Sequence, residues 1–257
     1  MPTPRRRLLS RAPLALALLL VGGCDMKGCR DDNSSGLPDS ARLDDLPPPT
    51  FGEATVAGNV TFDGVVPEPA IIGTSPQCGD VTDESVLVSA DGGLANVLVY
   101  LDGAPASSGL EREPATLSQS GCRFEPRVLG VQIGQPFEVS NGDPMRHNVH
   151  YTPDRNRDTN LAFEPSDPPR TEVFHAPEAA PVRIKCDIHP WMAAHVGVFA
   201  HPFYGVTDRD GGYAIGRVPA GDYTLVAWHE IYGKQEQPIV VADAGTIAGD
   251  FTFGRRQ

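Results

Sequence analysis

Short stretches of alternating apolar and polar residues, each closed by a turn, recur along most of this chain. "ATVAGNVTF" (54–62) runs into an Asp-Gly turn, and segment 205–230 alternates in the same way between a D-G turn and a P-A-G-D turn. A period of two is typical of strands with one buried face. Helical periodicity is not sustained over three turns in any segment, and 27 glycines and 25 prolines favour turns. The sequence therefore predicts an all-β protein of the sandwich type.

The first 24 residues have the pattern of an export signal. Arg5, Arg6 and Arg7 precede the apolar run "PLALALLLV" (13–21), which is too short to span a bilayer comfortably. "VGGC" (21–24) resembles a bacterial lipobox, which implies that Cys24 is the lipidated first residue of the mature protein. A twin-arginine signal and an ordinary cleaved signal remain alternatives. We expect a periplasmic or cell-surface protein held to a membrane by its lipid anchor, with residues 25–52, polar and proline-rich, as a flexible tether.

The charge of the chain limits its partners. The formal net charge is −12, and removal of the signal peptide takes away four arginines and no acid, which leaves about −16. Such an acidic protein is not expected to bind nucleic acid. We expect a redox protein partner with a basic patch.

Export places the five cysteines in a compartment where disulfides form. Cys24 would carry the lipid and Cys186 belongs to the motif described next. Cys78 and Cys122 each lie beside glycine in a turn-like context, and we predict that they form a disulfide, although other pairings are open from sequence alone. Cys29 is left over in a polar segment, and we expect it to be a free thiol or to lie close to the lipid.

The stretch "CDIHPWM" (186–192) places a cysteine, a histidine and a methionine at intervals of three residues. A thiolate, an imidazole and a thioether together suit copper, whereas zinc prefers four N, S or O ligands. A second histidine, His147, follows the predicted strand "PFEVSN" (136–141). Two alternatives are that these are ordinary core and surface residues, or that Cys186 is a redox thiol. The redox thiol is disfavoured because no resolving cysteine lies nearby.

"MRHNVHY" (145–151) and "CDIHPWM" resemble the two metal-binding segments of cupredoxins, over about 85 residues (115–200). The short spacing is most similar to that of the amicyanin subgroup. The resemblance implies one type 1 copper, with an axial methionine, and an asparagine that joins the two ligand loops. The residues concerned are His147, Cys186 and His189 as equatorial ligands, Met192 as the weak axial ligand and Asn148 as the linking residue. Arg146 departs from the pattern, in which proline usually precedes the first histidine.

A second resemblance concerns the flanking segments. "GNVTFDG" (58–64), "ANVLVYLDG" (95–103) and the segment 205–228 look like the opening and closing strands of a carboxypeptidase-regulatory-like (transthyretin-like) sandwich. We therefore expect residues 53–109 and 201–257 to form one domain and residues 110–200 to form an inserted cupredoxin domain. The rival organisation is a single large sandwich. The combination resembles methylamine-utilization-type lipoproteins.

The remaining histidines have weaker signals. His150, three residues after His147, should point to the other face of its strand. We expect His175 and His195 to be solvated. His201 and the His229–Glu230 pair could form an interdomain hydrogen-bond cluster or a second metal site, and the structural interpretation is favoured.

The sequence has no nucleophile elbow, H-E-x-x-H or phosphate loop. A copper ion with four protein ligands also leaves no open position for a substrate, so we expect an electron carrier rather than an enzyme. The alternatives are a copper-sequestering protein without electron transfer, or a cell-surface binding module in which the metal is structural.

Overall fold

The structure, a computed structural model, describes residues 43–108 and 111–254. Cys24, Cys29, the predicted signal peptide and tether residues 25–42 lie outside the described residues. Within them, strands carry almost all of the regular structure, and the one helical element is a short 3-10 turn, η1 (Leu43–Asp45). The all-β prediction is confirmed. No helix in this described part is long and apolar enough to cross a membrane.

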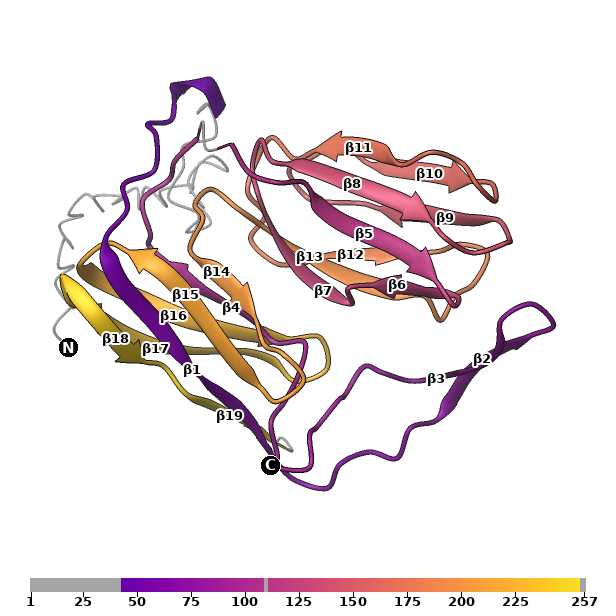
Figure 1. Ribbon diagram of the computed structural model, residues 1–257, viewed down its shortest axis with the longest axis horizontal. Helices are drawn as coiled ribbons and strands as arrows, with labels where there is room; N and C mark the ends of the chain where they lie inside the picture. The colour runs from indigo at the N-terminus through magenta and orange to yellow at the C-terminus, as the bar shows by residue number, and fades with distance from the viewer. Residues whose placement is uncertain (1–42, 109–110, 255–257) are drawn as a thin grey trace, which may run out of the picture. The chain divides into compact units, whose positions relative to one another are not determined.

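One sandwich, here called the split sandwich, is built from two distant chain segments (Figure 1). In its first sheet β1 (Glu53–Asp63) is central, and β15 (Gly212–Val218), β18 (Ala244–Ala248) and β19 (Phe251–Gly254) pair with it. The second sheet has the order β14 (Tyr204–Val206), β4 (Leu98–Asp102), β16 (Gly221–His229) and β17 (Gly233–Val241). Alternate residues such as Val56, Leu101 and Leu225 are buried in one core between the sheets.

The chain between β4 and β14 forms the second sandwich, here called the inserted sandwich. Its five-stranded sheet has the order β10 (Thr159–Phe163), β9 (His147–Tyr151), β12 (Val182–Lys185), β13 (Ala193–Phe199) and β7 (Val128–Gln132). The facing sheet has the order β11 (Arg170–Val173), β8 (Pro136–Asn141), β5 (Ala115–Ser120) and β6 (Arg123–Glu125). Phe137, Val149 and Ile184 belong to its own core.

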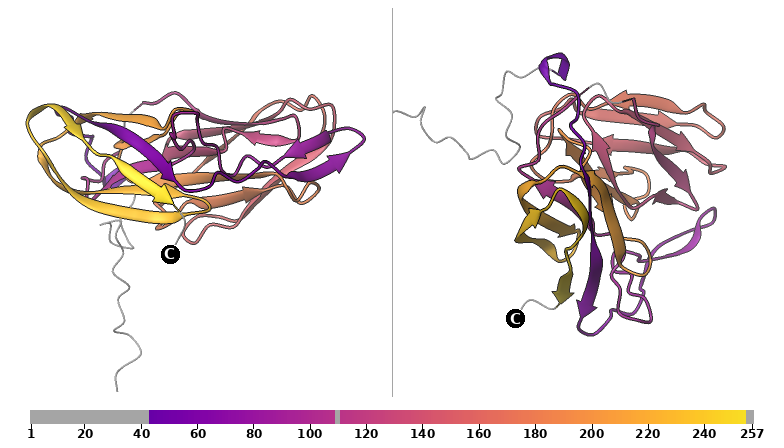
Figure 2. Two further views of the ribbon diagram at one scale, coloured as in Figure 1. Left: turned by 90° about the horizontal axis from the view of Figure 1, so that it is seen from below. Right: turned by 60° about the vertical axis from the view of Figure 1, so that its left-hand side comes forward.

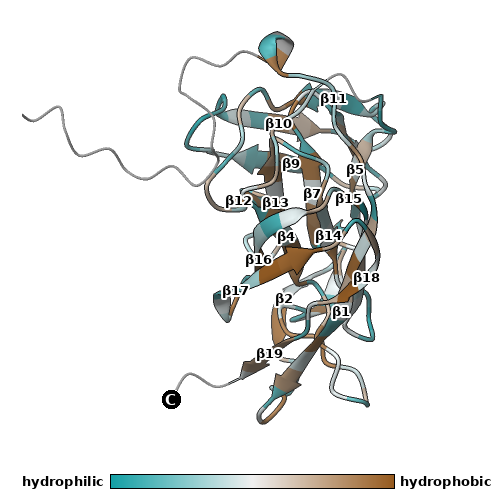
Figure 3. Ribbon diagram, turned by 90° about the vertical axis from the view of Figure 1, so that its left-hand side faces the viewer, coloured by the Kyte–Doolittle hydropathy of each residue, from teal (hydrophilic) through white to brown (hydrophobic). Residues whose placement is uncertain are grey.

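The two sandwiches meet over a small third cluster, in which Leu98, Val128 and Phe199 are buried. Gly130 makes the close approach feasible, since a Cβ there would lie 2.3 Å from the ring of Tyr204. Every residue of β13 is buried as a result, because the split sandwich covers the face that the inserted core does not. Parts of β13 and β16 are accordingly coloured as hydrophobic in Figure 3.

A hairpin of β2 (Ile71–Ser75) and β3 (Gly79–Thr82) leaves the split sandwich and packs against the inserted one (Figure 2). Val81 belongs to the core of the inserted sandwich, and Cys78 is bonded to Cys122 in a disulfide. The predicted disulfide is therefore present. The hairpin falls within the segment 53–109 that we assigned to the other domain, but its packing ties it to the inserted sandwich.

Two further expectations differ from the structure. The alternation in "SVLVSADGG" (85–93) also predicts a strand, but this segment forms only isolated bridges, because the turn at Gly92, with φ of 85°, ends the extended backbone. Tether residues 43–52 are packed rather than free, since Leu43 and Leu46 cover part of the inserted core and the Gly52 N–H donates to the Arg217 carbonyl.

Candidate metal centre

The site lies where β9 begins and where the loop between β12 and β13 turns. His147 is the first residue of β9, and Cys186 follows β12 directly. β9 and β12 are neighbours in the five-stranded sheet, paired at His150 and Lys185. Sequence segments about 39 residues apart are thus brought to the same end of one sheet.

Two imidazole nitrogens and one sulfur converge at this point. The Nδ1 atoms of His147 and His189 are 2.9 Å apart, and the Cys186 Sγ lies 4.0 Å from each of them. A point in this triangle about 2.0 Å from both nitrogens lies about 2.3–2.4 Å from the sulfur, close to ordinary metal–imidazole and metal–thiolate bond lengths. The three residues therefore fit a bound metal ion without rearrangement.

Met192 closes the loop on which Cys186 and His189 lie. Its N–H donates to the His189 carbonyl at 2.9 Å, and its carbonyl accepts from the Cys186 N–H at 3.4 Å. The side chains of Cys186 and Met192 are both 1% exposed. His147 is fully buried and His189 is half-buried, so one imidazole edge is nearer to solvent than the rest of the site.

Asp143 orients the first histidine, and the sequence analysis missed it. Its Oδ2 lies 2.9 Å from His147 Nε2, and its carboxylate accepts the N–H groups of Gly121 at 2.7 Å and Cys122 at 2.8 Å. Burial would raise the pKa of the Asp143 carboxyl, but these hydrogen bonds outweigh it and lower the pKa. A carboxylate at Nε2 keeps the proton there and leaves Nδ1 free for a metal. The signal was an acid four residues before the histidine.

Asn148 joins the two ligand segments. Its Oδ1 accepts the Asp187 N–H at 2.8 Å and lies 3.3 Å from the Cys186 Sγ, while its Nδ2 donates to the Asp187 carboxylate at 2.9 Å. Burial would raise the pKa of the Cys186 thiol, but the His147 imidazole and nearby backbone N–H groups outweigh burial and lower it. The thiolate, the form that binds metals, is favoured.

Trp191 covers the more exposed histidine. Its ring centre lies 5.1 Å from that of His189, and its Nε1 donates to the Cys122 carbonyl at 3.2 Å. Gly73 of the β2–β3 hairpin lies directly on the indole, since a Cβ at Gly73 would be 2.2 Å from the ring. The hairpin thus fixes a side chain that lines the metal centre.

The predictions for three other histidines have mixed outcomes. His150 is half-buried and its Nδ1 lies 2.7 Å from the Asp187 carboxylate, away from the three converging ligand atoms. His175 is exposed, as expected. The prediction for His195 is wrong: it is 8% exposed and its ring lies 5.1 Å from that of Trp228. The split sandwich covers His195, because Trp228 belongs to β16 of that sandwich.

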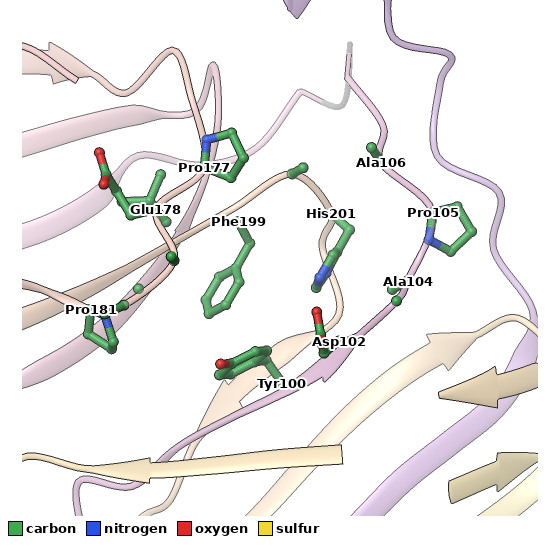
Figure 4. A pocket seen from close by; sticks show the side chains of 16 residues that line it. Tyr100, Asp102, Ala104, Pro105, Ala106, Pro177, Glu178, Pro181, Phe199 and His201 are labelled. Carbon is green, nitrogen blue, oxygen red and sulfur yellow. The ribbon is translucent and has the colours of Figure 1, made fainter. Parts of the chain in front are cut away.

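His201, His229 and Glu230 do not form a metal cluster in the described residues. Glu230 instead makes a two-point ion pair with Arg127 of the inserted sandwich, which supports the structural interpretation. His229 accepts the Ile231 N–H at 3.1 Å. His201 lines a cavity of about 270 Å³ together with Tyr100, Asp102 and Phe199, as Figure 4 shows. Burial lowers the pKa of His201 to about 4.

No protein-family model and no curated protein match this chain. Partial similarity exists to solved copper proteins. A copper-containing nitrite reductase from Thermus scotoductus SA-01 is 23% identical, with 37% of this chain and 24% of that chain covered and a TM-score of 0.29. The chain therefore spans about a quarter of that enzyme's length.

Similarity also extends to cupredoxins. A purple cupredoxin from Nitrosopumilus maritimus is 19% identical over 33% of this chain and 98% of its own, with a TM-score of 0.28. A reduced Cu(I) form of an amicyanin variant is 20% identical over 35% of this chain and 85% of its own, with a TM-score of 0.30. These similarities are too low to identify a metal centre, and the candidate site is defined by the residues described above.

Proposed function

We propose that this chain is an extracytoplasmic type 1 copper protein that carries single electrons between redox partners. The observation that carries the proposal is the convergence of the His147 and His189 Nδ1 atoms and the Cys186 Sγ at metal-binding distances. Copper in a His₂Cys site with a weak methionine ligand supplies one-electron chemistry between Cu(I) and Cu(II) with little change of geometry. We assign Met192 as that axial ligand because the loop buries it beside Cys186.

The surrounding residues would hold the ligands in place. Asp143 keeps the proton of His147 on Nε2, and Asn148 ties the Cys186 loop to β9. Burial of His147, Cys186 and Met192 excludes water from most of the site. The half-buried His189 offers the shortest way for an electron to leave or enter.

The test is a spectrum of the full-length chain loaded with Cu(II). We expect an intense visible thiolate-to-copper charge-transfer band that disappears reversibly on reduction. Cys186→Ser should abolish the band, and His175→Gln, which changes an exposed histidine outside the site, should leave it intact. A band that survives Cys186→Ser, or no copper uptake, would contradict the proposal. A colourless protein that holds only Cu(I) would favour sequestration.

We also propose that the protein is anchored through a lipid on Cys24, and that it meets a basic partner. Support comes from the lipobox-like sequence and the net charge of −12. Cys24→Ala should move the protein from the membrane fraction to the soluble fraction. Electron exchange with the partner should slow as ionic strength rises, because salt screens the attraction between opposite charges. The split sandwich would be a carboxypeptidase-regulatory-like domain that carries the copper domain.

A further inference from the structure

A second group of sulfur atoms lies beside the proposed copper site. The Met145 Sδ is 3.5 Å from the Cys122 Sγ and 3.8 Å from the Cys78 Sγ. Disulfide sulfurs carry no proton, so these are contacts between sulfur atoms rather than hydrogen bonds. Cys122 is 1% exposed, and Cys78 and Met145 pack against the core of the inserted sandwich. Three of the chain's softest ligand atoms are therefore gathered in one place.

This sulfur group adjoins the metal centre from the far side of His147. The Cys122 Sγ, a carboxylate oxygen of Asp143 and a ring nitrogen of His147 all lie within 4.8 Å of one another. The Nδ1 of His147 faces Cys186 and His189, whereas its Nε2 is held by Asp143. One histidine thus separates the two sets of sulfur ligands.

We propose that reduction of the Cys78–Cys122 disulfide creates a second copper site, selective for Cu(I), with the thiolates of Cys78 and Cys122 and the thioether of Met145 as ligands. A dithiol reductant supplies two electrons and two protons and is itself oxidised to a disulfide, and the S–S bond breaks to give two thiols. Binding of Cu(I) then displaces both thiol protons into solvent. Soft thiolate and thioether ligands select Cu(I).

The Met145 sulfur already lies at distances from the two cysteine sulfurs that are close to those that a three-coordinate Cu(I) site requires. Two of the three sulfur separations, 3.5 and 3.8 Å, are in place. If the two cysteine sulfurs separate to about 3.8 Å on reduction, the centre of the triangle lies about 2.1–2.2 Å from each sulfur, near the ordinary metal–thiolate length of about 2.3 Å. The Cα atoms of the two cysteines are 5.7 Å apart, so rotation of the side chains provides this movement.

The site is also accessible to a reductant, and it is better suited to copper than to zinc. Cys78 is half-buried in the turn of the hairpin, between the exposed residues Gln77 and Gly79. A thiolate can therefore attack the Cys78 sulfur, with Cys122 as the leaving group. Zinc would require a fourth ligand. The Asp143 carboxylate, within 4.8 Å of the Cys122 Sγ, is already engaged by two backbone N–H groups and His147.

The experiment is an anaerobic Cu(I) titration of the full-length chain against a chromophoric Cu(I) chelator, before and after treatment with dithiothreitol and its removal. We expect the reduced protein to bind one more equivalent of Cu(I) than the oxidised protein. The Cys78→Ser/Cys122→Ser variant should show no such difference. Met145→Leu keeps both cysteines, and it should weaken the extra equivalent at least tenfold while the oxidised form binds Cu(I) like the wild type.

Three results would overturn the proposal. They are an equal Cu(I) stoichiometry in both redox states, an unchanged affinity in Met145→Leu, and loss of the β-sheet circular dichroism signal on reduction, which would assign the extra copper to an unfolded chain. The measured quantity is the difference between reduced and oxidised protein. It therefore does not depend on the visible band that tests the first site, and either proposal can fail without the other.

Discussion

Asp143 is the residue through which the proposed copper site can be weakened without removing a ligand. In the wild type one oxygen, Oδ1, accepts the Gly121 N–H, and the other, Oδ2, accepts the Cys122 N–H and His147 Nε2. Asn has one carbonyl oxygen and one NH₂. With its oxygen at the Oδ2 position it still serves Cys122 and His147, and only the Gly121 N–H loses its acceptor. Asp143→Asn therefore keeps the tautomer of His147 but removes the negative charge behind it.

The expected magnitudes follow from this difference. Loss of an outer carboxylate costs about 10–100-fold in metal affinity, and a tenfold change is about 1.4 kcal/mol. We expect Asp143→Asn at the tenfold end. Asp143→Ala leaves all three donors without an acceptor and frees the His147 tautomer, so we expect about 100-fold. Asp143→Asn should also lower the free energy of unfolding by about 1–3 kcal/mol, because one backbone donor is left unsatisfied.

The assay is competition for Cu(II) with a chromophoric chelator, followed through the visible band, together with urea denaturation of the copper-free protein. Asp222→Asn is a matched control, since Asp222 is an exposed carboxylate of β16 in the split sandwich. Wild-type copper affinity in both Asp143 variants would refute the claim that this carboxylate orients His147. So would an Asn variant weaker than the Ala variant, because the argument requires the Asn oxygen to retain part of the function.

Four further predictions concern stability and are checked by urea denaturation of the copper-free protein. Asn148→Ala should lower the free energy of unfolding by about 1–3 kcal/mol, because buried hydrogen bonds of the ligand loop are lost. Cys78→Ser should cost about 4 kcal/mol, the loop-entropy value for a disulfide that spans 44 residues. Glu230→Gln should cost about 3–5 kcal/mol by leaving the Arg127 guanidinium unpaired, and replacing both with leucine should recover most of this. Burial lowers the pKa of His201 to about 4 from an ordinary 6.5, so between pH 6.5 and 4 the imidazole gains a proton only in the unfolded chain. The free energy of unfolding should therefore fall as the pH drops from about 6.5 to 4, and it should fall less steeply in His201→Gln.

The strands, and the three side chains that converge at the candidate metal centre, were within reach of sequence reasoning because both depend largely on local patterns. The alternation of apolar and polar residues in 54–62 indicates a strand with one buried face, and β1 (Glu53–Asp63) is such a strand. "CDIHPWM" carries three candidate ligands within seven residues, so only His147 had to be placed by longer-range argument. Its position after the strand "PFEVSN" was enough for that.

The predictions that failed concern surfaces that are buried or bonded by segments of the chain distant in sequence. The residues of β13 can indicate which face meets the core of the inserted sandwich. They do not indicate that the split sandwich buries His195. All five residues of β2 are exposed or half-exposed, and β3 has a single buried residue. This pattern is too weak to show which sandwich the hairpin joins. Asp143 was missed because its role depends on the backbone N–H groups of residues 121 and 122.

Those two N–H groups belong to a segment that supports both histidine ligands. The Cys122 N–H donates to Asp143, which holds His147, while the Cys122 carbonyl accepts from Trp191, which packs on His189. The disulfide fixes this segment to the β2–β3 hairpin, whose Gly73 lies directly against the Trp191 ring. Because a single peptide segment restrains both imidazoles, a movement of the hairpin would shift them together. We infer that, in the proposed copper site, the hairpin would limit through Cys122 the rearrangement of the ligands between the two oxidation states.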